Sequence, residues 1–202
     1  PRIQSALLEC MNEAQVSIDG VTRKLTAPFL VVATQNNRYA SGTFPLPEPQ
    51  LDRFLLSVEM KLPDLESQAE ILRLHAGGKN GSKREPVVSV EMVAEWQRKV
   101  AELPVADSIC RYVVALGEAA RNHPALGDGI SARGSIALMR AAQAAAVLEG
   151  HEAVYPDDVK RMTIPVFAHR LVPAGDEYGS ELPRRGRVIS VLREILDTTP
   201  VP

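Results

Sequence analysis

The feature that most constrains the fold is a short apolar run that stops abruptly at polar residues. Residues 29–33 (FLVVA) include two adjacent valines and no charge, a pattern typical of a strand buried on both faces of a parallel sheet. Thr34, Gln35 and Asn36 follow at once. Ligands bind such sheets beyond the carboxyl ends of the strands, so the pattern makes Asn36 a candidate site residue. The alternative, that these polar residues only turn the chain, stays open on spacing alone.

The segments around this run predict a small mixed α/β unit. Residues 1–14 have the spacing of an amphipathic helix, and residues 15–25 alternate around an Asp-Gly pair, which indicates a hairpin. After the run, Pro47 to Arg53 predicts a short helix, and residues 54–62 (FLLSVEMKL) predict a further strand. Arg53 would lie at the junction of this helix and strand.

From Pro63 onward the pattern becomes helical, because Pro63 ends the second strand and Asp64 can cap a helix. Apolar residues at three- and four-residue spacing predict helices at Leu65–His75, Val90–Leu103, Ala106–Asn122, Ala132–Glu149 and Asp157–His169. The glycine-rich segment 77–86 predicts an exposed loop. Residues 171–187 break the helical period before a last short helix at 188–196, which we expect to pack on the bundle or on a neighbour.

These patterns divide the chain into three parts and bound its class. We expect domains at 1–62, 63–170 and 171–202, with mostly helical structure overall. The chain is 45% hydrophobic and 24% charged, enough for a real core. Its net charge of −2, from 23 basic and 25 acidic residues, gives no overall electrostatic case for nucleic acid or an anionic membrane as partner. No apolar run approaches the roughly 18 residues of a membrane span, and residues 1–10 lack a signal-peptide core, so we expect a cytoplasmic location.

Metal and redox chemistry find no support in the sequence. Cys10 and Cys110 each fall in a helical pattern without a partner at ligand or redox-motif spacing, so we expect them to be reduced and buried. The four histidines are scattered and form no Cys/His group. The sequence therefore predicts no metal site.

The motifs that bind nucleotide phosphates and magnesium are also missing. A phosphate-binding loop needs GxxxxGK[ST], because backbone amides and a lysine surround the phosphates while the hydroxyl binds magnesium. The nearest string, Gly78-Lys79, has Asn80 where Ser or Thr is needed and Arg73 where the first glycine should be. The acidic pair Asp176-Glu177 follows no apolar strand.

Short motifs along the sequence nevertheless resemble those of a known ATPase family. The strings QSALLECM, QVSIDG, ATQN, GTFPLPEPQLDRF, LEGHEAVYPDDV, AHRLV and the closing PVP resemble, in order, the MoxR family of AAA+ ATPases. The resemblance covers the whole chain and implies an α/β plus all-α fold class: the C-terminal fragment of an AAA+ αβα nucleotide-binding core, followed by a helical bundle lid domain. In this family the Walker A and B motifs precede the helix with which the chain begins. We therefore expect more protein upstream of Pro1, and no ATP hydrolysis by this chain alone.

The resemblance also assigns site residues. Asn36 matches sensor 1 and Arg53 matches the arginine finger. GISARGSIALMRAA matches the sensor 2 segment, in which Ser131 begins a helix and Arg133 lies in its first turn. The implied mechanism has Asn36 orient the attacking water, Arg133 contact an ATP phosphate, and Arg53 reach into the adjacent subunit to offset charge in the transition state. From the residues alone, Arg133 could instead be a solvated arginine at a helix start, and Arg140 is interpreted as structural.

Residues 18–21 match the tip of the pre-sensor 1 hairpin. Three positions depart from the family pattern. Asn37 replaces a proline, residues 38–40 replace acidic residues, and Tyr155 replaces a threonine cap before Pro156, which removes a side-chain cap.

Taken together, the resemblance implies a ring ATPase that acts on protein complexes. When full length it would use ATP and Mg²⁺ in a homo-oligomeric ring, expected to be a hexamer, and couple hydrolysis to remodelling or maturation of a protein client. Two alternatives stay open. One is a nucleic-acid motor or chelatase-type subunit, since MCM helicases and magnesium chelatase subunits share the hairpin and lid. The balanced charge of the chain and the lack of aromatic residues in the hairpin disfavour nucleic acid as a partner. The other is a non-catalytic helical interaction module.

Overall fold

The computed structural model describes residues 9–35, 47–76, 85–175 and 181–202. A helical turn at residues 9–13 comes first. The elements that follow are β1 Gln15–Ile18, β2 Val21–Lys24, α2 Glu48–Leu51, α3 Leu65–Ala76, α4 Val90–Glu102, α5 Asp107–Arg121, α6 Ala132–Glu149, α7 Pro156–Phe167 and α8 Glu181–Thr198. Most described residues are helical, as the sequence predicts.

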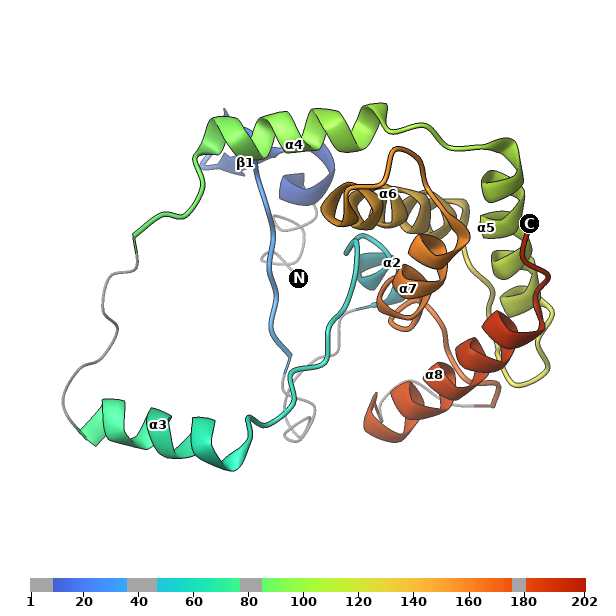
Figure 1. Cartoon of the computed structure of the whole chain (residues 1–202). Helices are drawn as coiled ribbons and strands as arrows, with labels where there is room; N and C mark the ends of the chain where they lie inside the picture. The colour runs from blue at the N-terminus through green and yellow to red at the C-terminus, as the bar shows by residue number, and fades with distance from the viewer. Residues whose placement is uncertain (1–8, 36–46, 77–84, 176–180) are drawn as a thin grey trace.

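The hydrophobic core lies within a bundle of the four helices α5 to α8 (Figure 1). α6 packs against α4, α5 and α7, and α8 packs against α5 and α7. Each helix contributes a fully buried apolar side chain, respectively Leu116, Leu138, Val166 and Leu192. The amphipathic helices of the second half of the chain thus enclose the hydrophobic core.

Local signals at both ends of α6 fix its position. The Ser131 Oγ accepts a hydrogen bond from the Gly134 N–H at 3.1 Å, which satisfies one of the free amides of the first turn. Gly150 ends the helix with φ +76°, a conformation that favours glycine. Between them, an alanine-rich face allows close packing in the core. The observed bounds are those predicted from the sequence.

The start of α7 shows how the chain manages without the usual cap. Tyr155 makes no side-chain cap hydrogen bond. Instead the Asp158 carboxylate accepts from the Tyr155 N–H at 2.9 Å, and Pro156 occupies the first helical position, where no amide donor is needed. The helix therefore forms as predicted despite the departure at Tyr155.

The predicted hairpin is confirmed. β1 and β2 pair antiparallel, with Ile18 opposite Val21. Asp19 and Gly20 both have positive φ, +51° and +77°, as the two-residue turn favoured in hairpins requires. Ile18 and Val21 are exposed at the tip.

The two predicted core strands are wrong for this chain. Residues 29–33 and 54–62 contain no assigned strand, and β1 and β2 form the one sheet found in the described ranges. Leu30 and Val32, predicted to be buried, are 81% and 78% exposed. A strand buried on both faces needs neighbouring strands and covering helices, and the described residues supply neither next to this run.

The C-terminal end differs from the prediction in a second way. α8 begins at Glu181 rather than at Val188, so part of the segment expected to be irregular is helical. Its packing on the bundle is as expected, because Val188, Leu192 and Ile195 are buried. Before it, residues 171–175 lie along the loop after α5, with the Gly127 N–H donating to the Val172 carbonyl at 2.9 Å.

The remaining expectations have mixed outcomes. Both cysteines are free, but Cys110 is exposed on the outer face of α5 and Cys10 is half-buried, so their predicted burial is wrong. α3 buries no side chain and lies apart from the bundle in Figure 1. No helix in the described ranges is long and apolar enough to cross a membrane.

Candidate functional site

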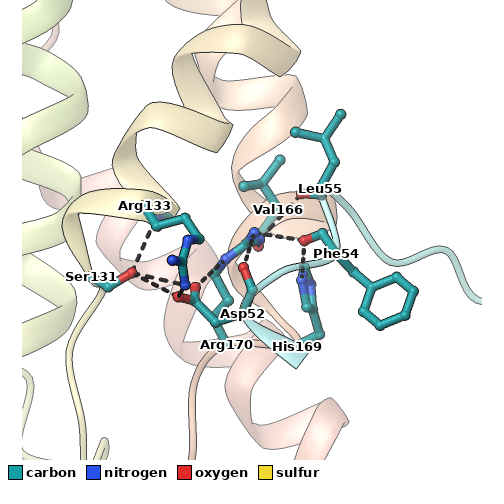
Figure 2. A network of polar contacts seen from close by, with 9 residues as sticks. Asp52, Phe54, Leu55, Ser131, Arg133, Val166, His169 and Arg170 are labelled. Atoms are coloured by element: carbon teal, nitrogen blue, oxygen red, sulfur yellow. Dashed lines mark hydrogen bonds and ion pairs between the residues drawn. The ribbon is translucent and has the colours of Figure 1, made fainter. Parts of the chain in front are cut away.

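Asp52, in the turn after α2, connects the N-terminal half of the chain to the bundle. Its carboxylate accepts hydrogen bonds from the Ser131 Oγ at 3.2 and 3.3 Å, from the Arg133 Nη1 at 3.3 Å and from the Arg170 Nε at 2.9 Å (Figure 2). Ser131 and Arg133 lie at the start of α6, where a negative charge is favoured by the helix dipole. Two guanidinium groups share one carboxylate here, so one positive charge remains uncompensated within this group of residues.

Arg170 is the buried centre of the contacts around Asp52. Its side chain is 3% exposed. Its Nη2 donates to the carbonyl oxygens of Asp52 at 3.1 Å and Phe54 at 2.6 Å, and its Nη1 donates to that of Leu55 at 3.2 Å and to Val166. The pKa of Arg170 is lowered, chiefly by burial, and the hydrogen bond to Asp52 opposes this shift. A buried cation is tolerated only when its donors are satisfied, which the planar guanidinium achieves here.

Gly134 leaves room for the Arg170 side chain beside α6. A Cβ at this position would lie 2.7 Å from the Ile130 Cγ2 and 3.2 Å from the Arg170 Cδ. The first turn of α6 can therefore approach Arg170 closely only with glycine at this position.

His169 makes a second contact with the same backbone. Its Nε2 donates to the Phe54 carbonyl at 3.0 Å. Burial, and then the neighbouring charge of Arg170, lower the pKa of His169 from 6.5 to about 4. The imidazole is therefore neutral at pH 7, and its proton lies on Nε2.

The Arg53 side chain binds a residue outside the Asp52 contacts. Its Nη1 donates to the Asn12 Oδ1 of the helical turn 9–13, and its buried Nε has no partner among the described residues. Its backbone N–H donates to the Gln50 carbonyl at 3.3 Å. The residue is half-buried in the turn after α2.

Of the site residues predicted from the sequence, Arg133 takes part in the contacts around Asp52, whereas Arg53 binds Asn12 instead. Arg133 lies beside Asp52, next in the chain to Arg53, and its side chain is 56% exposed. Arg140, further along α6, donates to the Gln143 Oε1 at 3.2 Å, which agrees with its structural interpretation. Asn36 lies outside the described residues. Thr34 and Gln35, just before it, are exposed.

Sequence reasoning missed the roles of Asp52, His169 and Arg170. Asp52 and Arg170 are 118 residues apart, and no local periodicity can pair them. The signal available was the string AHRLV, which the resemblance includes without giving it a role. As for metals, no group of three or more potential ligands occurs in the part of the chain that the structure describes.

Comparison with protein families matches two parts of the chain. Residues 1–56 match the ATPase family associated with various cellular activities (AAA). Residues 118–186 match the AAA lid domain. The Asp52 contacts therefore join a segment of the ATPase family match to the lid match.

Curated relatives align over almost the whole chain. An uncharacterized protein, YeaC, of Bacillus subtilis is 39% identical over all of the chain and 62% of its own length. The chaperone MoxR1 of Mycobacterium tuberculosis is 33% identical over all of the chain and 54% of its own length. The magnesium-chelatase 38 kDa subunit of Rhodobacter capsulatus is 30% identical over 94% of the chain and 51% of its own length. The chain thus spans between half and two thirds of these relatives.

A solved structure agrees with the fold. The crystal structure of a candidate ATPase from Cytophaga hutchinsonii is 31% identical and superposes with a TM-score of 0.85 over all of the chain and 62% of its own length. Together with the family matches, this similarity confirms the predicted fold class: the C-terminal part of an AAA+ core followed by a helical lid.

Proposed function

We infer the function from one premise: this chain belongs to the MoxR family of AAA+ ATPases. We propose that it is the sensor and lid part of a protein that hydrolyses ATP with Mg²⁺ in a homo-oligomeric ring. The energy released would remodel or mature a protein client.

The observation that carries the proposal is the exposed guanidinium of Arg133. It lies at the N-terminus of α6, in a group of residues with one uncompensated positive charge. A guanidinium beside a capped helix start suits a phosphate oxygen, which both the charge and the geometry favour. In the structure, the anion bound to Arg133 is the Asp52 carboxylate. A phosphate would compete with this carboxylate for the Arg133 guanidinium.

The remaining roles follow the family pattern. Asn36 would orient the attacking water, and Arg53 would offset charge on the nucleotide of the adjacent subunit. Magnesium, when bound, offsets charge on the phosphates. The phosphate-binding loop and the acidic pair that hold the nucleotide and the metal would come from outside this sequence, because it contains neither motif.

The experiment uses the full-length protein with two single substitutions. Arg53→Ala should reduce ATP turnover about a thousandfold or more, the usual effect of losing an arginine finger, with the Kd for ATP nearly unchanged. Arg133→Ala should raise the Kd or KM for ATP. Arg140→Ala, on the same helix, is the matched control and should change neither. Unchanged turnover in Arg53→Ala would remove Arg53 as the finger.

A chaperone-like action is the favoured use of the hydrolysis, and the similarity to the chaperone MoxR1 supports it. A client that copurifies with the full-length protein and is released by ATP would support this role. Similarity to a magnesium-chelatase subunit supports a second candidate, a chelatase-type subunit. ATP-dependent magnesium insertion by a reconstituted mixture, without a protein client, would favour that second candidate.

A further inference from the structure

We propose that Arg170 is a positioning residue for the arginine finger, because it clamps the backbone on both sides of Arg53 to the helical bundle. The inference rests on the proposed function, since it takes Arg53 to be the finger. It adds a residue of the lid to the machinery that delivers Arg53 to a neighbouring nucleotide.

One guanidinium holds three backbone positions around residue 53. Arg170 donates to the carbonyl oxygen of Asp52, immediately before Arg53, at 3.1 Å. It donates to those of Phe54 at 2.6 Å and Leu55 at 3.2 Å, immediately after Arg53. Its Nε also binds the Asp52 carboxylate at 2.9 Å (Figure 2). These contacts of Arg170 with Asp52, Phe54 and Leu55 form a clamp. The clamp fixes the backbone that carries Arg53 from both sides.

The other end of the clamp is part of the bundle. Arg170 follows α7 and donates to the Val166 carbonyl in the last turn of that helix. The same segment is attached at a second place, where the Ser57 N–H donates to the Pro165 carbonyl at 2.8 Å. Arg185 of α8 donates to the Ser57 Oγ at 2.9 Å. Residues 52–57 are thus attached by hydrogen bonds to both α7 and α8.

Burial separates positioning from chemistry. With 3% of its side chain exposed, Arg170 cannot reach a nucleotide. A buried cation that lost its acceptors would be strongly disfavoured, so the clamp resists stretching. By contrast, one side-chain contact of Arg53, to Asn12, connects it to the helical turn 9–13.

The clamp also links the two arginines that the function assigns to nucleotides. Arg133 binds the same Asp52 carboxylate from an exposed position, at 3.3 Å. A ligand that displaces Arg133 or α6 would therefore disturb Asp52 and, through it, the backbone that carries Arg53. Lid displacement at one nucleotide would therefore move the finger that is presented to another.

The first test is kinetic and uses the full-length protein. Arg170→Lys keeps the charge but loses the planar fork that reaches several carbonyls. We expect kcat to fall about 10- to 100-fold, as for a misplaced catalytic group, with the Kd for ATP unchanged. Arg121→Lys is the matched control: Arg121 donates to the Ile130 carbonyl at 3.0 Å, a contact within the lid that does not touch residues 52–57. This variant should keep the wild-type kcat.

The second test asks on which side of the subunit boundary Arg170 acts. Mixed rings of Asn36→Ala and Arg53→Ala subunits should regain turnover, because some boundaries then pair an intact site with an intact finger. Arg170→Lys should regain turnover when mixed with Asn36→Ala and not when mixed with Arg53→Ala. A purely structural defect would show no such partner dependence.

The outcomes separate this inference from the proposed function. If wild-type full-length protein does not hydrolyse ATP, the proposed function fails. If wild type hydrolyses ATP and Arg170→Lys keeps its kcat, or regains turnover with Arg53→Ala, the positioning role is overturned. If Arg170→Lys fails to fold, as judged by the loss of its thermal unfolding transition, Arg185→Lys replaces it in the test. Arg185→Lys loosens the same segment at Ser57 and must show the same drop in kcat and the same mixing pattern.

Discussion

At the scale of single residues, Gly134 decides how closely α6 approaches the Arg170 side chain. We predict that Gly134→Ala lowers the free energy of unfolding by about 1–3 kcal/mol, since the added methyl group would overpack against Ile130 and Arg170. Denaturant titration measures the change. Gly186→Ala in α8 is the control, because nothing lies within 4 Å of its added Cβ, and it should raise stability by up to about 1 kcal/mol. Equal effects at both glycines would refute the steric explanation.

His169 predicts a pH dependence of stability. Its pKa is lowered from 6.5 to about 4 in the folded chain, so between these values the unfolded chain binds more protons than the folded one. The free energy of unfolding should therefore fall as the pH falls from 6.5 to 4, by up to about 3 kcal/mol. His169→Gln keeps an N–H donor for the Phe54 carbonyl but does not titrate. Parallel pH curves for wild type and this variant would show that His169 is not the cause.

At the scale of elements, the helices and the hairpin were predictable, whereas the strands predicted at 29–33 and 54–62 do not form. The bounds of α6 follow from local signals, the Ser131 cap and the Gly150 stop. The run 29–33 has the composition of a buried strand, but a strand forms only against partners, and none is supplied beside it by the described residues. The link from Asp52 to Arg170 spans 118 residues, so no local pattern could reveal it. The start of α8 was missed because residues 181–187 lack apolar periodicity.

The packing of α8 gives a test at this scale. Leu192 is fully buried against the bundle, so Leu192→Ala should lower the free energy of unfolding by about 2–5 kcal/mol through lost burial and a cavity. Leu148→Ala, in α6, removes a side chain that is 84% exposed and should have little effect. Thermal or denaturant unfolding of the two variants compares them directly. Similar losses for both would mean that α8 does not close the core.

At the scale of the whole molecule, the chain joins an ATPase segment and a lid but spans only 62% of its relative YeaC. We predict that the 202-residue chain shows no ATP turnover, because its sequence lacks both phosphate-loop and magnesium motifs. A phosphate-release assay on the purified chain measures this, with Arg53→Ala as a blank for contaminating ATPase. Turnover that Arg53→Ala abolishes would contradict the prediction.

The extended segments around α2 have a consequence for handling the chain in solution. Several apolar side chains in these segments are exposed to water, namely Leu30, Val32, Val58, Met60 and Leu62. Their backbones form no β-ladder with another segment that the structure describes. Such stretches are templates for strand pairing between molecules. A preparation of this chain at high concentration is therefore prone to aggregate through the two segments that were predicted to be strands.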